Sequence, residues 1–189
     1  MARLLRLLPC ATLAFVALAL GTASAATAAA TEPCADTALR PSAENLERVR
    51  EATLCLLNAE RADHGLPALR ANERLTRAAE SYSAKMVRRR FFAHVCPEGS
   101  TLKRRIRSAK YLNKSVRDYS LGENLAWGSG SLATPKSIVR GWMRSSAHRD
   151  AILNSRFRDA GVGIARGAPR KVRGRAATYT IEFGYRVTT

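Results

Sequence analysis

Residues 161–165 read Gly-Val-Gly-Ile-Ala, and residues 178–184 read Thr-Tyr-Thr-Ile-Glu-Phe-Gly. Both runs are rich in β-branched or aromatic residues, and a basic turn with glycine and proline, from Arg166 to Arg175, separates them. This pattern predicts a β-hairpin. The helical signals all come earlier in the chain. Helices followed by strands favour an α+β domain, in which helices cover an antiparallel central sheet.

Two long helices are expected upstream of the hairpin. From Glu44 to about Asp63, apolar residues recur at three- and four-residue spacing, and the sequence His-Gly-Leu-Pro at 64–67 ends the pattern. Asn72 is expected to be the N-cap of the second helix, which closes with three arginines at 88–90, where positive charge complements a helix C-terminus. Its predicted inward face consists of Leu75, Ala78, Ala79, Tyr82 and Met86.

Two shorter helices are expected between these and the hairpin. Ser100 follows a Pro-Glu-Gly turn and is expected to cap a helix that runs through Ser108. Thr134-Pro135 combines a capping residue with proline at the first helical position, which predicts another helix start. The inward residues of that helix are predicted to be Ile138, Val139 and Trp142.

The N-terminus has the three parts of a secretion signal. Two arginines within the first six residues precede an apolar stretch from Leu7 to Leu20, which is short for a membrane span, and a small-x-small site follows at Ala23-Ser24-Ala25. Residues 1–25 are therefore predicted to be a cleavable signal peptide, with an uncleaved membrane anchor as the alternative. No later stretch is apolar enough to span a membrane, so we expect a secreted, extracellular protein.

Cleavage would leave 164 residues, enough for one domain, with 30 basic and 15 acidic residues. Such a charge favours contact with polyanions, and the alternative is a solvated basic surface. Residues 26–43 are rich in alanine and threonine and are expected to form a flexible leader pinned only by Cys34. A Cys34–Cys55 disulfide would attach this leader to the first helix. Cys96 would then be free, or available to an intermolecular partner.

Two of the three histidines and one glutamate are candidates for chemistry. Glu123 lies in Gly-Glu-Asn-Leu-Ala-Trp at 122–127, where flanking glycine and apolar residues leave a carboxylate poorly solvated, so it requires a cation, a proton or hydrogen-bond donors. His94 follows Phe-Phe-Ala at 91–93. His148 follows Trp142 and Ser145 in the order Trp-x-x-Ser-x-x-His.

Four short motifs follow one another along the chain. In order, they are Leu-Asn-Ala-Glu-Arg at 57–61, Phe-Ala-His at 92–94, Gly-Glu-Asn-Leu-Ala at 122–126 and the Trp-x-x-Ser-x-x-His-Arg run. In this succession the chain resembles the CAP superfamily, which contains cysteine-rich secretory proteins, antigen 5 and plant pathogenesis-related proteins. The match is closest to the bacterial branch and covers roughly residues 48–186. The resemblance implies that residues 44–189 form a CAP (SCP-like) domain, a three-layer α-β-α sandwich with a central cleft.

The resemblance also implies a metal site. Family members with the full set line the cleft with two histidines and two acidic residues, which can hold a divalent cation, often zinc. By this resemblance His94, Glu123 and His148 are the candidate metal ligands, and Ser145 stands where the second acidic residue would be. Two imidazoles and one carboxylate leave a coordination position open to water, which is chemically adequate for zinc. Glu182 is a further acidic residue, on a predicted strand.

Several functions are compatible with these residues. The chain has no Gly-x-Ser-x-Gly elbow and no His-Glu-x-x-His helix, and Ser145 with His148 on an expected turn lacks an orienting third group. We therefore expect a non-catalytic binding or interaction domain at the cell envelope or outside the cell. One alternative is a metal-dependent secreted hydrolase, a protease or esterase, that uses His94, Glu123 and His148. Another is a binder of anionic cell-wall polymers or lipids. No feature predicts specific nucleic-acid binding.

Overall fold

The computed structural model describes residues 33–189, so the predicted signal peptide lies outside the described part. The elements follow the order α1 (Leu46–Asp63), β1 (Arg70–Ala71), α2 (Glu73–Arg89), α3 (Leu102–Ser108), β2 (Val116–Ser129), the 3₁₀ turn η1 (Gly130–Ala133), α4 (Pro135–Arg144), α5 (Ser146–Ile152), β3 (Asp159–Arg166) and β4 (Ala176–Thr188). None of the helices among residues 33–189 is long and apolar enough to cross a membrane.

The strands form one sheet in the order β1-β3-β4-β2. The β3–β4 hairpin predicted from the sequence is confirmed, with Val162 opposite Ile181. β2 runs antiparallel to β4 along nearly its whole length. The sheet departs from a purely antiparallel one only at β1, where Arg70 and Ala71 pair in parallel with the start of β3. The sheet is therefore mixed, with an antiparallel body.

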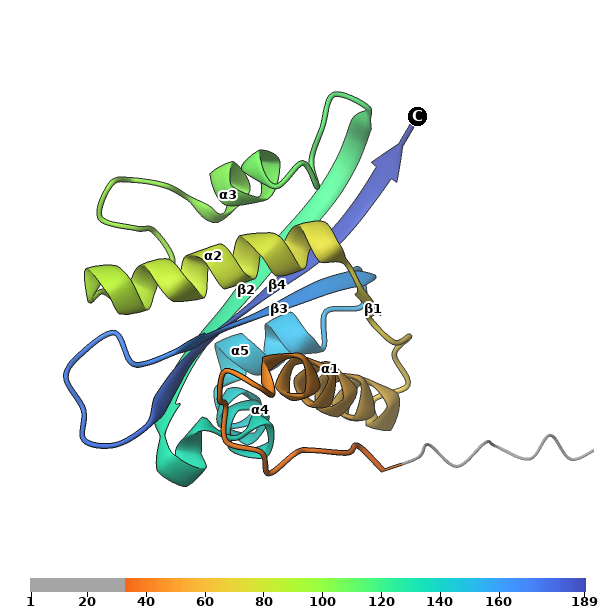
Figure 1. Cartoon of the computed structure of the whole chain (residues 1–189). Helices are drawn as coiled ribbons and strands as arrows, with labels where there is room; N and C mark the ends of the chain where they lie inside the picture. Colours follow the sequence, from red (N-terminus) through yellow and green to blue (C-terminus); the bar gives the residue numbers. More distant parts are fainter. Residues whose placement is uncertain (1–32) are drawn as a thin grey trace, which may run out of the picture. The chain divides into compact units, whose positions relative to one another are not determined.

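The helices lie on both faces of the sheet, as Figure 1 shows: α2 and α3 cover one face, and α1, α4 and α5 cover the other. The larger core fills the second side, where Trp142, Phe183 and Ile181 are buried together. Smaller clusters fill the first side, around Leu75 beneath α3 and around Tyr82 and Met86. This arrangement is the three-layer α-β-α sandwich that the resemblance implied.

Two glycines of β3 decide how closely α2 packs on the sheet. A Cβ atom added at Gly161 would lie 2.1 Å from backbone atoms of Leu75, and one at Gly163 would lie 2.0 Å from the backbone of Ala79. No side chain fits in this space, because real Cβ contacts are longer. The Gly-Val-Gly run therefore lets the helix backbone rest directly on the strand, while Val162, on the opposite face, enters the larger core.

Most predicted helix signals are confirmed, and two details were wrong. Asn72 and Thr134 cap α2 and α4 through their side chains, and the predicted inward residues of both helices are buried. The cap of α3 is Thr101, whose hydroxyl accepts from the Arg104 amide, and not Ser100. His148 lies within helix α5 and not on a turn, because the chain restarts a helix directly after Ser145.

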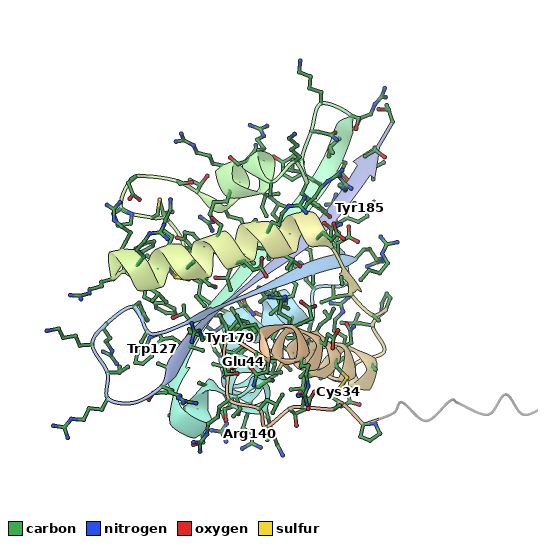
Figure 2. All side chains as sticks on the ribbon, viewed as in Figure 1. Cys34, Glu44, Trp127, Arg140, Tyr179 and Tyr185 are labelled. Atoms are coloured by element: carbon green, nitrogen blue, oxygen red, sulfur yellow. A yellow bond between two sulfur atoms is a disulfide. The ribbon has the colours of Figure 1, made fainter. Side chains whose placement is uncertain are left out.

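The described part of the leader is held by more than the disulfide. The predicted Cys34–Cys55 bridge is present and joins the leader to α1, beside which Figure 2 labels Cys34. Asp36 also forms an ion pair with Arg48 on α1. The backbone carbonyl of Thr37 accepts a hydrogen bond from the start of α4. The expectation that only Cys34 pins this stretch is therefore wrong for residues 33–43.

Two further residues, Cys96 and Arg61, are buried in the domain. Cys96 is a free thiol and is buried, which removes it from contact with an intermolecular partner. Arg61 is fully buried without a carboxylate partner in the described part of the chain. Its guanidinium donates instead to the backbone carbonyls of Pro67, Ile152, Asn154 and Phe157. This arginine therefore anchors α1 to the segment that leads into β3.

Candidate functional site

The centre of the site is a pair of facing carboxylates. Glu123 on β2 is directly opposite Glu182 on β4 in the antiparallel register, and directly paired residues project to the same face of a sheet. The side chain of Glu123 is 2% exposed and that of Glu182 is fully buried. Two acidic groups so close together in a water-poor environment require a compensating charge or proton.

Arg105 on α3 supplies a positive charge between these carboxylates. Its Nη2 donates to Oε2 of Glu123, and its Nε lies 3.7 Å from Oε1 of Glu182. Its Nη1 donates to the backbone carbonyls of His94 and Ser100, at 3.1 Å each. The guanidinium also lies 3.5 Å from the centre of the Tyr82 ring, a cation–π contact. Contacts on several sides fix Arg105 as part of the site.

Glu182 is the member of the carboxylate pair whose buried position favours the neutral form. Burial is the main cause that raises its pKa well above the ordinary value, and the negative charge of Glu123 adds to it. Neither oxygen of Glu182 has a hydrogen-bond partner among the described residues. With Glu182 neutral, the single charge of Arg105 balances the single charge of Glu123.

His94 completes the network at its exposed end. It lies in the loop after α2, and its Nδ1 is 2.7 Å from Oε1 of Glu123. This hydrogen bond is the main cause of a raised pKa for His94. The imidazole is 58% exposed, so the network reaches solvent at this ring. Both Glu123 oxygens are therefore used, one by His94 and the other by Arg105.

His148 lies near this network, and its properties differ from those of His94. Burial lowers its pKa, and the positive charge of His94 lowers it further. The backbone carbonyl of His148 accepts a hydrogen bond of 2.9 Å from the Asn124 side chain and so ties α5 to β2. Ser145 lies at the junction of α4 and α5.

An apolar groove of about 380 Å³ adjoins His148. Phe92 and Leu132 contribute the most exposed apolar side chains of this groove, at 46% and 66%. Trp127 also lines it, and Figure 2 labels this residue near the β3–β4 loop, from which the guanidinium of Arg170 lies 4.5 Å from its ring. The groove therefore offers apolar and aromatic surface beside a polar imidazole.

These residues do not fit a metal ion in this arrangement. Among residues 33–189, no three side chains of histidine, cysteine, aspartate or glutamate are grouped so that they could hold one. Glu123 has both oxygens engaged, one of them by a cation that a metal would have to displace. Only His94 and His148 remain as nitrogen donors, which is fewer than the three or four protein ligands of a zinc site. The zinc site stays a prediction from the sequence.

Sequence reasoning missed the most connected residue of the site. Arg105 is one of four cations in the run Leu-Lys-Arg-Arg-Ile-Arg-Ser, and nothing distinguishes it from Arg104 in the sequence. The apolar residues Leu102 and Ile106, which both pack into the cluster beneath α3, are the local signs that one side of this helix faces the protein. The proposed need of Glu123 for a cation is met, although by a residue from α3.

The fold and the motif order can be compared with known proteins. The family model for CAP, the cysteine-rich secretory protein family, matches residues 54–183. The chain belongs to this family. Relatives include the uncharacterized protein YkwD of Bacillus subtilis, 35% identical over 57% of this chain and 39% of the relative. Another is the uncharacterized membrane protein YlbC of the same species, 32% identical over 60% of this chain and 30% of the relative. The chain thus covers less than half the length of these CAP proteins.

Two solved CAP-type structures have the same fold. An extracellular protein with an SCP domain from Bacillus anthracis aligns with a TM-score of 0.58 and 23% identity, over 77% of this chain and 44% of the other. An outer surface protein of Borrelia burgdorferi aligns with a TM-score of 0.60 and 22% identity, over 79% of this chain and all of the other. At these identities the likeness establishes a shared fold.

Proposed function

We propose that this CAP domain is a non-catalytic binding domain that acts at the cell envelope or outside the cell. The observation that carries the proposal is the pairing of Glu123 with Arg105. A carboxylate held by a buried guanidinium is a poor metal ligand, because a metal ion would have to displace this partner. The exposed ring of His94 and the apolar groove stay accessible for recognition.

The external location is supported by the signal-like N-terminus and by the disulfide, which persists in oxidising compartments. Two proteins of similar structure, an extracellular protein and an outer surface protein, agree with this location. Ligands available at this location include cell-wall polymers and lipids. The groove suits a ligand with an apolar face for Phe92 and Leu132 and a polar group within reach of His148.

The experiment is a sedimentation assay with purified peptidoglycan as the probe. Replacing Phe92 and Leu132 together by alanine removes apolar surface of the groove, and we expect about tenfold weaker binding, because each exposed side chain buries only part of its area. Replacing Val172 and Val187 by alanine is the matched control, since these residues are similarly exposed but do not line the groove. Equal loss in both variants would contradict the proposal.

One observation favours a second candidate, hydrolysis by His94. Oε1 of Glu123 accepts a hydrogen bond from Nδ1 of this ring. A carboxylate orients a catalytic histidine in this way and leaves Nε2 of the ring directed away from the carboxylate. The test is turnover of peptide and ester substrates, with the His94→Ala variant as control, followed by calorimetric titration of zinc with Glu123→Gln for comparison. Turnover that is lost in the His94 variant would establish this candidate in place of the first.

A further inference from the structure

We propose that the groove between α2 and α3 is a binding site for a phosphodiester polymer that lacks nucleobases, such as a polyol phosphate. The groove has a volume of about 420 Å³ and shares no lining residue with the apolar groove beside His148, although Arg105 of the carboxylate network also lines it. Its walls are the faces of two helices, and Figure 1 shows α3 lying along α2 on the same side of the sheet. This inference goes beyond the proposed function and does not depend on it.

The lining of the groove is cationic and rich in hydroxyl groups. Arg77, Ser81 and Lys85 lie four residues apart on α2 and so form one row along the helix. Arg104 and Ser108 face them from α3. No carboxylate lines the groove. Guanidinium, ammonium and hydroxyl groups together are the side chains that donate to phosphate oxygens.

The nearby carboxylates leave much of this charge uncompensated. Glu73 contacts Arg77 only at 3.6 Å and is 94% exposed, so water screens that pair. Glu98, which forms an ion pair with Arg89, lies near Lys85. Arg104 has no ion pair among the described residues. The cations are therefore available to an anionic ligand.

The spacing of the cations favours a chain over a single ion. Arg77 and Lys85 are eight residues apart on α2, which corresponds to about 12 Å along the helix axis. Cations spread over this length can each meet a different phosphate group, whereas a free phosphate ion would reach only some of them. The proposed ligand is therefore a polymer with repeated phosphates.

Two other kinds of phosphate-bearing macromolecule fit the groove less well. Single-stranded nucleic acids gain affinity by stacking bases on aromatic rings, but the only aromatic residue of the groove is Tyr82, and the guanidinium of Arg105 lies on its ring. Amphipathic helices bind membrane surfaces through apolar side chains that lie beside the cations. The exposed apolar side chains Phe92, Leu132 and Val187 do not line this groove.

The test is calorimetric titration of the protein with poly(glycerol phosphate) at several salt concentrations. The variant Arg77→Gln/Arg104→Gln removes two groove cations, and we expect about tenfold weaker binding, with a salt dependence smaller by about 0.7 in slope for each lost cation. Lys171→Gln/Arg173→Gln is the matched control, because it removes the same charge from the exposed β3–β4 loop. Arg105 is left unchanged because it belongs to the cleft network.

The outcomes separate the explanations. Loss confined to the groove variant, with chemical-shift changes in α2 and α3 of the unmodified protein on titration, supports the site. Equal loss in both variants would assign the binding to net charge and overturn it. The choice of polymer would also be overturned if an oligothymidylate of equal charge bound as tightly through the same residues. The same holds for vesicles of phosphatidylglycerol and phosphatidylcholine in equal parts. Absence of binding to poly(glycerol phosphate) at low salt would overturn the proposal as well.

Discussion

Replacing Arg105 by methionine tests the proposed charge balance of the cleft most directly. The substitution keeps the length and apolar character of the stem but removes the cation from two carboxylates that are 2% and 0% exposed. Because water cannot take over, Glu123 is left as a buried charge that retains only the hydrogen bond of His94. Breaking a buried ion pair from one side costs about 3–5 kcal/mol of unfolding free energy. The loss of the Tyr82 contact adds to this cost.

The assay is equilibrium unfolding in urea at neutral pH, extrapolated linearly to water. The control is Arg104→Met, which removes the same charge from an exposed neighbour and should change stability by about 0.5 kcal/mol or less. Adding Glu123→Gln to the Arg105 variant should recover part of the loss, because a neutral amide no longer needs the cation. The deficit of the single variant should also shrink as the pH falls, since protonation removes the unpaired charge. A loss below about 1 kcal/mol for Arg105→Met would refute the charge balance.

Three further predictions concern other parts of the domain. In NMR titrations His94 should have a pKa above 6.5, and His148 should have a pKa below 6.5. Because the pKa of His94 is raised on folding, its contribution to stability should be present below pH 6.5 and should disappear as the pH rises through the pKa of the folded state. Equal pKa values for the two rings would contradict the different surroundings that the structure gives them. Gly163→Ala should lower the unfolding free energy by about 1–3 kcal/mol, because the new methyl group would collide with the backbone of α2. Gly141→Ala, in helix α4 with no atom near the new methyl group, should instead raise it by about 0.5–1 kcal/mol. Thermal unfolding of the two variants measures this difference, and similar shifts in both would refute the close contact of α2 with β3. Replacing both cysteines of the disulfide by serine removes a link across 21 residues and should lower the unfolding free energy, measured in urea, by about 3 kcal/mol. A reductant that destabilises the unmodified protein but leaves this variant unchanged would confirm that the bridge is responsible.

The sequence predicted the elements whose signals are local. The caps at Asn72 and Thr134, the inward faces of α2 and α4, and the β3–β4 hairpin depend on residues a few positions apart, and all were placed correctly. β2 was missed. Its stretch, Val116–Ser129, mixes charged, polar and apolar residues without strict alternation, because it is an edge strand of the sheet and only partly buried.

By itself, then, the sequence determined the α+β class, favoured the Cys34–Cys55 disulfide, and indicated the CAP family with His94, Glu123 and His148 as candidate site residues. Only the tertiary structure decided what surrounds them. The antiparallel register placed Glu182 opposite Glu123, and the packing of α3 brought Arg105 between them. Both contacts join residues that are far apart in the chain or indistinguishable from their neighbours, so no local pattern encodes them. The folded domain, and not a local sequence pattern, therefore places the guanidinium of Arg105 beside Glu123.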